Sequence, residues 1–183
     1  MNKIVAFGAS NSKNSINKKL ATFAANQIAN AEIQLLDLND FEMPIYGIDR
    51  EKENGIPPLA LEFKEHIKKA DSIIISFAEH NGSYSTAFKN ILDWISRIKS
   101  ENGVWENKPM LLMATSPGGR GGKTALDLAT TSFKFMNNNS ITSFSLPSFY
   151  QNFSDEKGII EEQLLEDFNE HLKSFRESSW ILN

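Results

Sequence analysis

The sequence predicts an α/β fold, a three-layer sandwich with a parallel sheet between two layers of helices. Two observations lead to this prediction. Short apolar runs alternate with longer segments in which apolar residues recur every three or four positions, as strands alternate with amphipathic helices. One run, residues 72–77, is continuous and rich in isoleucine, which is typical of a strand buried on both faces. Consecutive strand–helix units form a parallel sheet with helices on both faces.

The elements follow from this spacing. The expected strands cover residues 4–7, 33–38, 72–77, 110–114 and 141–146. The expected helices cover residues 15–28, 59–70, 88–98, 126–136 and 164–175, the second of them beginning after Pro57-Pro58. Right-handed crossovers between five such strands favour the flavodoxin-like order 2-1-3-4-5.

We expect residues 1–183 to form one domain, since this length supports a single sizeable core. In a sheet of this order, strand two is added on one side of strand one, and strands three to five are added on the other side. The place where the order reverses, between strands one and three, is the switch point, and ligands bind there. The loops after strands one, three and four are therefore the expected site.

Composition narrows the class of protein. The formal net charge of −4 argues against nucleic acid or an anionic membrane as a partner. There are no cysteines, which excludes disulfides, thiolate nucleophiles and cysteine metal sites. No histidine–carboxylate spacing indicates a metal site. The first apolar run is too short for a signal peptide, and no run reaches the length of a membrane helix, so we expect a cytoplasmic protein.

The loop after strand one, residues 8–17, predicts a phosphate site. It carries Ser10, Ser12 and Ser15 ahead of an expected helix. A helix N-terminus presents free N–H groups and partial positive charge, and hydroxyls add neutral donors. The alternative is that Ser15 only caps the helix and the rest is a polar turn. Because Gly8 is the only glycine of the loop, a dinucleotide fingerprint is excluded and a mononucleotide phosphate is favoured.

The loop after strand three favours a flat polar ligand. It contains Asn81-Gly82, a tight turn whose glycine lets a ligand approach the backbone closely. The alternative is an ordinary Asn-Gly turn. His80 precedes the turn and is expected to contact the ligand.

The loop after strand four, residues 116–124, ends in Gly-Lys-Thr but is not a phosphate-binding Walker loop. That pattern needs a glycine where Pro117 stands. We interpret it as a glycine-rich loop at the ligand's far edge, with Arg120 and Lys123 available to a nicotinamide dinucleotide phosphate; a flexible surface loop is the alternative.

Three segments together resemble the NADPH-dependent FMN reductase family, which includes quinone, chromate, azo and nitro reductases. The family's first loop reads roughly G-S-x-R-x-x-S-x-N-x-x-L-A, and residues 9–21 here read ASNSKNSINKKLA. A D-L-x-x-L-P-L-Y-like stretch is matched at residues 37–46 by DLNDFEMPIY. The most specific motif, P-E-Y-N-G-S-Y-P…K-N-x-L-D-W, is matched at residues 78–94 by AEHNGSYS…KNILDW.

The resemblance implies a set of cofactor-binding residues. The FMN phosphate would be held by Ser10, Ser15, Ile16 and Asn17, with Ser12 in the place of the family's arginine. We expect the side chains of Ser15 and Asn17 to bind phosphate and to be dispensable for the fold. The flavin ring would be lined by Glu79, His80, Asn81 and Gly82, with Ser116 and Gly118 near its other side. Ala78 and Ser85 replace prolines of the family, and His80 replaces a tyrosine.

The function implied by the resemblance is an FMN-dependent NAD(P)H oxidoreductase with a ping-pong mechanism. NADPH or NADH would reduce the flavin, and a quinone, free flavin, azo compound, nitro compound or metal oxyanion would take the electrons. No side chain need act as a nucleophile or acid, because the flavin carries the chemistry. The alternatives are a non-enzymatic electron carrier of flavodoxin type and a regulatory protein that retains the fold.

We also expect a homodimer or a dimer of dimers. The family resemblance favours it, and the sequence adds aromatic residues without obvious partners in one domain: Trp94, Trp105 and the segment Phe149–Phe153. Two long segments predicted as loops, residues 43–58 and 148–158, add to this surface. Tryptophan and tyrosine are enriched at interfaces, and symmetric dimers are the commonest assembly.

Overall fold

The fold is described by a computed structural model that covers residues 2–180. The strands are β1 Asn2–Ala9, β2 Ala31–Leu36, β3 Ser72–Phe77, β4 Glu79–His80, β5 Ser83–Tyr84, β6 Met110–Thr115, β7 Ile141–Leu146, β8 Phe153–Ser154 and β9 Gly158–Ile159. The helices are α1 Ile16–Asn26, α2 Ile48–Asn54, α3 Pro58–Lys69, α4 Thr86–Ile95, α5 Lys123–Phe133, α6 Phe149–Asn152 and α7 Glu162–Trp180, with a 3₁₀ turn, η1, at Leu38–Phe41.

The main sheet has five parallel strands in the order β2-β1-β3-β6-β7. In chain order these are the strands that the sequence predicts, so the order 2-1-3-4-5 is confirmed. Every residue of β3 and β6 is buried, because helices cover both faces of these central strands. The carboxyl ends of β1, β3 and β6 therefore lie side by side, as the predicted site requires.

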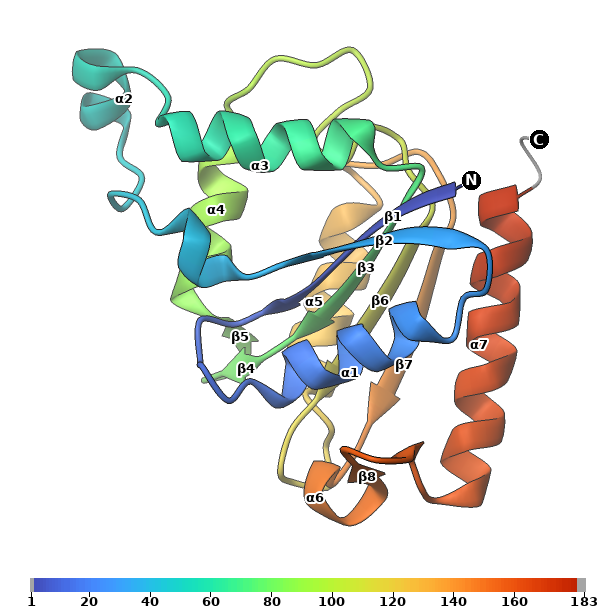
Figure 1. Cartoon of the computed structure of the whole chain (residues 1–183). Coiled ribbons are helices and arrows are strands. Elements are labelled where there is room, and N and C mark those ends of the chain that lie inside the picture. The colour runs from blue at the N-terminus through green and yellow to red at the C-terminus, as the bar shows by residue number, and fades with distance from the viewer. Residues whose placement is uncertain (1, 181–183) are drawn as a thin grey trace.

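Helices cover both faces of the sheet (Figure 1), and each face has its own hydrophobic cluster. On one face, alternate residues of β1, β3 and β6 pack against α3, α4 and α5. On the other face, the intervening residues, such as Ile4, Ile74 and Leu111, pack against α1 and α7. This alternation follows from the two-residue period of a strand.

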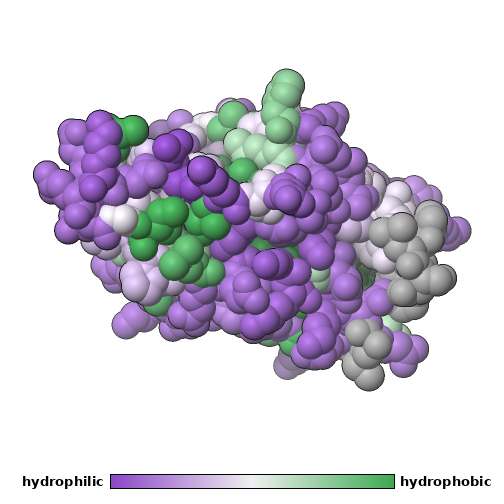
Figure 2. Space-filling model, turned by 90° about the horizontal axis from the view of Figure 1, so that it is seen from above, coloured by the Kyte–Doolittle hydropathy of each residue, from purple (hydrophilic) through white to green (hydrophobic). Residues whose placement is uncertain are grey.

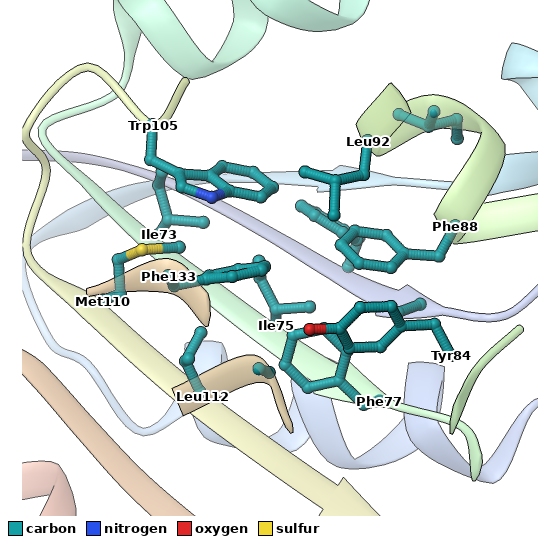
Figure 3. Close-up of a cluster of buried hydrophobic side chains, with 14 of the residues drawn as sticks. Ile73, Ile75, Phe77, Tyr84, Phe88, Leu92, Trp105, Met110, Leu112 and Phe133 are labelled. Carbon is teal, nitrogen blue, oxygen red and sulfur yellow. The ribbon is translucent and has the colours of Figure 1, made fainter. Parts of the chain in front are cut away.

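Figure 3 shows the first cluster, in which aromatic side chains from several elements meet beside β3. Trp105 lies 4.7 Å from Phe133 and is stacked on Phe88, measured between ring centroids. Trp105 and Trp94 are both fully buried within the single chain. The expectation that these tryptophans lack partners in one domain is therefore wrong. Trp105 packs within this cluster, and the Trp94 indole N–H donates to the Pro44 carbonyl at 2.8 Å while its ring meets Tyr46 edge to face.

The loop between α4 and β6 is fastened by a buried ion pair. The Lys64 ammonium donates to the carbonyls of Gly103 and Val104 and lies 2.7 Å from the Glu106 carboxylate, and both side chains are more than nine-tenths buried. Burial lowers the pKa of Lys64. Burial raises the pKa of Glu106, but hydrogen bonds, that from Lys64 foremost, outweigh it and hold the pKa below its usual range. The pair holds this loop, which carries Trp105, against α3.

The predicted elements differ from the structure mainly at their ends. Leu38 lies in η1 rather than in β2, and Ile98 lies beyond the end of α4. The two segments predicted as long loops contain short elements, since α2 interrupts the first, and α6 and β8 the second. α2 buries none of its residues and projects from the body in Figure 1.

Figure 2 views the molecule from above relative to Figure 1, from the side on which α2 and α3 lie. This surface is mostly hydrophilic, and its hydrophobic patches lie among polar residues. Each helix within residues 2–180 is too short or too polar to cross a lipid bilayer.

Replacing Glu106 by Gln should lower the free energy of unfolding by about 3 kcal/mol, because the charge of Lys64 stays buried without its counter-ion. Urea unfolding at pH 7 measures this. The double variant Lys64→Met, Glu106→Gln removes both charges and should recover most of the loss. A single variant within about 1 kcal/mol of the native chain would contradict a stabilising role for the pair.

Candidate functional site

The loops after β1, β3 and β6 enclose one cavity of about 340 Å³ at the predicted switch point. We call it the switch-point cavity. Its lining is Ser10, Asn11, Ser12, Asn14, Ser15, Ile16, Asn17, Ala78, Glu79, His80, Thr115, Ser116, Pro117 and Tyr150. The volume falls within the range of small-molecule sites, which is about 300–1,000 Å³. Size alone does not single this cavity out. A cavity of about 500 Å³ adjoins it, and another of about 390 Å³ lies near the first residues of β1 and β2.

The first turn of α1 supplies hydrogen-bond donors to this cavity. Ser15 caps the helix, since its Oγ accepts from the N–H of Lys18 at 3.1 Å. The backbone N–H groups of Ile16 and Asn17 have no acceptor within residues 2–180. Both residues line the cavity, and the helix dipole adds partial positive charge there. The arrangement suits an anion such as a phosphate.

Gly8 allows the first turn of α1 to pack directly against the backbone of β1. A Cβ at this position would lie 2.4 Å from the backbone nitrogen of Lys18 and 2.9 Å from the carbonyl carbon of Asn17. Any side chain would therefore push the first turn of α1 away from β1. Close approach of the two backbones is the reason for glycine at the end of this strand.

Asn17 has a structural role that the sequence analysis missed. Its Oδ1 accepts from the Ser76 hydroxyl at 2.8 Å and from the N–H of Thr115 at 3.0 Å, and its Nδ2 donates to the Thr115 carbonyl at 3.1 Å. The side chain is buried and ties α1 to the ends of β3 and β6. The expectation that Asn17 is dispensable for the fold is therefore corrected. Its contact with a phosphate stays a prediction, now for its backbone N–H.

The segment after β3 is a tight hairpin, β4–β5, as the Asn-Gly pair predicts. Asn81 and Gly82 both have left-handed backbones, with φ of 53° and 74°, which is the conformation of a type I′ turn. Oε2 of Glu79 accepts from the N–H of Ala125 at 3.1 Å, which fixes the hairpin against the first turn of α5. His80, the last residue of β4, is exposed to solvent and lines the cavity.

The glycine-rich loop after β6 packs against β7. A Cβ on Gly121, whose φ is +59°, would lie 2.5 Å from the Ser145 hydroxyl. The cations of the loop are engaged locally: Arg120 donates to the Thr124 hydroxyl at 2.6 Å, and Lys123 pairs with Asp127 at 3.0 Å. Neither lines the switch-point cavity.

Most of the predicted site residues come together in this cavity. Those that line it are Ser10, Ser12, Ser15, Ile16, Asn17, Glu79, His80 and Ser116. Asn81, Gly82 and Gly118 do not line it. The first two form the turn of the hairpin, and the Gly118 carbonyl accepts a hydrogen bond from Ser116 at 3.1 Å.

Sequence reasoning missed several lining residues. They are Asn11, Asn14, Ala78, Thr115, Pro117 and Tyr150. Most of them are next to predicted site residues in the sequence, so extending each predicted segment by one residue would have found them. Tyr150 is different, since it comes from α6, far along the chain, and no local motif links it to the other loops.

Replacing Asn17 by Ala should lower the free energy of unfolding by at least about 2 kcal/mol, because the buried Ser76 hydroxyl and Thr115 N–H lose their acceptor. Thermal or urea unfolding of the protein without ligand measures this. Ser12→Ala is the matched control, since the Ser12 hydroxyl has no partner within residues 2–180. Equal stability of the two variants would show that the Asn17 side chain does not hold the loops together.

Comparison with known proteins adds to this geometry. The pattern of the NADPH-dependent FMN reductase family matches residues 2–151. The NADPH:quinone oxidoreductase of Arabidopsis thaliana is 34% identical over 97 residues, which are 53% of this chain and 47% of that protein. The quinone reductase of Pseudomonas putida is 32% identical over 125 residues, which are 68% of this chain and 65% of that protein. The alignments thus span less than two thirds of the length of these relatives.

A solved structure extends the likeness to the whole fold. The flavoenzyme NAD(P)H:(acceptor) oxidoreductase FerB from Paracoccus denitrificans superposes with a TM-score of 0.77 at 22% identity, covering 98% of this chain and 97% of that one. The family pattern spans most of the chain, including the loops after β1, β3 and β6 that form the cavity. The chain therefore belongs to the NADPH-dependent FMN reductase family.

Proposed function

We propose that this chain is an FMN-dependent NAD(P)H oxidoreductase that passes electrons to a small acceptor, with quinones as the favoured class. One observation carries the proposal: the cavity at the switch point has free helix N–H groups at one loop and a tight hairpin at the next. The family and the quinone reductases among its relatives support the choice of donor and acceptor.

The donors present fit the phosphate end of FMN. The N–H groups of Ile16 and Asn17 and the hydroxyls of Ser10 and Ser12 would hold the phosphate, since all four residues line the cavity. The Oγ of Ser10 also accepts from the N–H of Ser12 at 3.2 Å, so its proton is free to face a phosphate oxygen. This site relies on neutral donors and the helix dipole.

The remaining lining would hold the flavin ring. That part of the lining comes from residues 78–80 after β3, residues 115–117 at the end of β6, and Tyr150 of α6. FMN, when bound, accepts two electrons from a reduced nicotinamide and releases them to an acceptor. The protein's part is to bind, orient and shield: Glu79 holds the hairpin on α5, and Asn17 holds the phosphate loop on β3 and β6.

The purified chain should bind FMN and turn yellow, NADPH or NADH should bleach it, and a quinone should restore the colour. A visible spectrum recorded through these additions measures all three steps. Bleaching without reoxidation by quinones, azo or nitro compounds would indicate an electron carrier instead. Absence of FMN binding would contradict the proposal and favour a regulatory role.

Ser12 allows the phosphate contact to be tested in both directions. Ser12→Ala should weaken FMN binding roughly tenfold or more, because a hydrogen bond to a charged group is lost. Ser12→Arg should tighten binding and make it more dependent on salt, because it restores a cation. Calorimetric titration of the apoprotein at two ionic strengths checks this. No change in either variant would remove Ser12 from the site.

We also propose a homodimer in the cytoplasm, where reduced nicotinamide nucleotides are supplied. With both tryptophans buried, the support comes from the segment around α2. Ile45 and Ile48 are 69% and 52% exposed, and α2 buries none of its residues. Large exposed apolar side chains grouped on a projecting segment are typical of an interaction surface.

The variant Ile45→Glu, Ile48→Glu should convert the dimer to a monomer, because like charges would face each other across a symmetric interface. Light scattering on a sizing column measures the mass. Phe135→Glu is the control, since Phe135 is also exposed, at 88%, but lies beyond α5. A native mass equal to one chain at micromolar concentrations would overturn the dimer.

A further inference from the structure

Tyr150 differs from the rest of the switch-point cavity in its exposure. It lines the cavity, yet it is 72% exposed. Asn17, Ala78 and Thr115 line the same cavity and are buried. These buried residues therefore form the floor of the cavity, and Tyr150 lies at its rim, on the side open to solvent.

Hydrogen bonds from α6 hold this rim on the loop that follows β6. The N–H of Ser148 donates to the Gly118 carbonyl, and the N–H of Phe149 donates to the Ser116 carbonyl, each at 3.0 Å. Ser116 itself lines the cavity. In Figure 1, α6 lies below the carboxyl end of β7, at the edge of the sheet where the cavity is found. Tyr150 is therefore attached to the wall of the cavity.

The backbone at the start of α6 is strained. Ser148 has φ of 48° and ψ of 56°, a left-handed conformation that is costly for a residue with a side chain. Such strain persists only where surrounding contacts impose it, and it is common at ligand sites. One such contact is Phe149, which is buried and stacks on Phe153 with ring centroids 4.7 Å apart.

The Tyr150 ring is supported by one neighbour and is otherwise open. It meets Phe149 edge to face, with ring centroids 5.6 Å apart. Because the residue is 72% exposed, most of its ring stays available to a ligand. An aromatic face attracts another planar ring by stacking. A compact inorganic ion has no ring face to offer it.

We propose that the Tyr150 ring stacks against the planar ring of the acceptor and thereby favours aromatic acceptors, such as naphthoquinones, over compact inorganic ones. This rests on the proposed function, in which FMN occupies the cavity and the acceptor approaches it from solvent. The floor and walls would place the flavin, and the acceptor would meet the rim. Tyr150 would contribute binding alone, since the flavin carries the electron transfer.

The test is calorimetric titration of the oxidised, FMN-loaded protein with 1,4-naphthoquinone. Both partners are oxidised, so binding is measured without electron transfer, and the chain has no cysteine that the quinone could alkylate. Tyr150→Ala should bind the quinone about three- to tenfold more weakly than the native chain, because one pair of stacked rings is lost. Tyr150→Phe keeps the ring and should bind like the native chain.

Turnover gives a second measurement. In Tyr150→Ala the KM for 1,4-naphthoquinone should rise by the same factor, while the kcat and the KM for ferricyanide stay unchanged. Phe135→Ala is the matched control, because Phe135 is an exposed ring, at 88%, that does not line the cavity. It should leave all of these quantities at their native values.

Equal affinity of Tyr150→Ala and the native chain for 1,4-naphthoquinone would overturn the proposal. Absence of binding by the native chain, or a Tyr150→Phe variant as weak as Tyr150→Ala, would also overturn it. So would a shifted visible spectrum of bound FMN in Tyr150→Ala, because the ring would then be needed to place the flavin. Failure of the proposed function is recognised separately, since the native chain would then not bind FMN at all.

Discussion

The hydrogen bonds of Asn17 hold the three loops of the site together. Its side chain reaches from the first turn of α1 to Ser76 at the end of β3 and Thr115 at the end of β6. Gly8 makes this reach possible by letting the helix backbone lie against β1. A buried amide satisfied on both of its polar atoms is costly to disturb. The helix N–H groups of Ile16 and Asn17 are thereby held at the strand ends, where a phosphate can meet them.

The two faces of the sheet serve this arrangement differently. The face covered by α3, α4 and α5 is rich in aromatic side chains and is fastened at its rim by the Lys64–Glu106 pair. The face covered by α1 and α7 lies beside the polar loop that precedes α1 and lines the switch-point cavity. Rigidity on one side and polar loops on the other are what a cofactor site needs, since binding groups must be placed by a fixed scaffold.

The predictions that failed did so for tertiary reasons. Trp94 and Trp105 looked unpartnered because their partners are distant in sequence. Trp94 contacts Pro44 and Tyr46, and Trp105 packs on Phe88 and Phe133. Arg120 and Lys123 are a different case, because their partners Thr124 and Asp127 lie only four residues further along the chain, a local spacing that helix geometry brings within reach. The Asn17 side chain looked free to bind phosphate because its actual partners, Ser76 and Thr115, are distant in sequence. For the two tryptophans and Asn17, the deciding contact is one that local spacing does not encode.

The sequence by itself determined the five-stranded parallel sheet, its order, the loops that meet at the switch point and the family to which the chain belongs. These follow from periodicity, strand burial and a few motif residues, all of which are local properties. Only the tertiary structure decided which polar groups remain free. Whether an asparagine or a lysine can meet a ligand depends on which distant groups already occupy its hydrogen bonds. The packing of α1 against β1 settles that for Asn17, because its side chain is taken by Ser76 and Thr115.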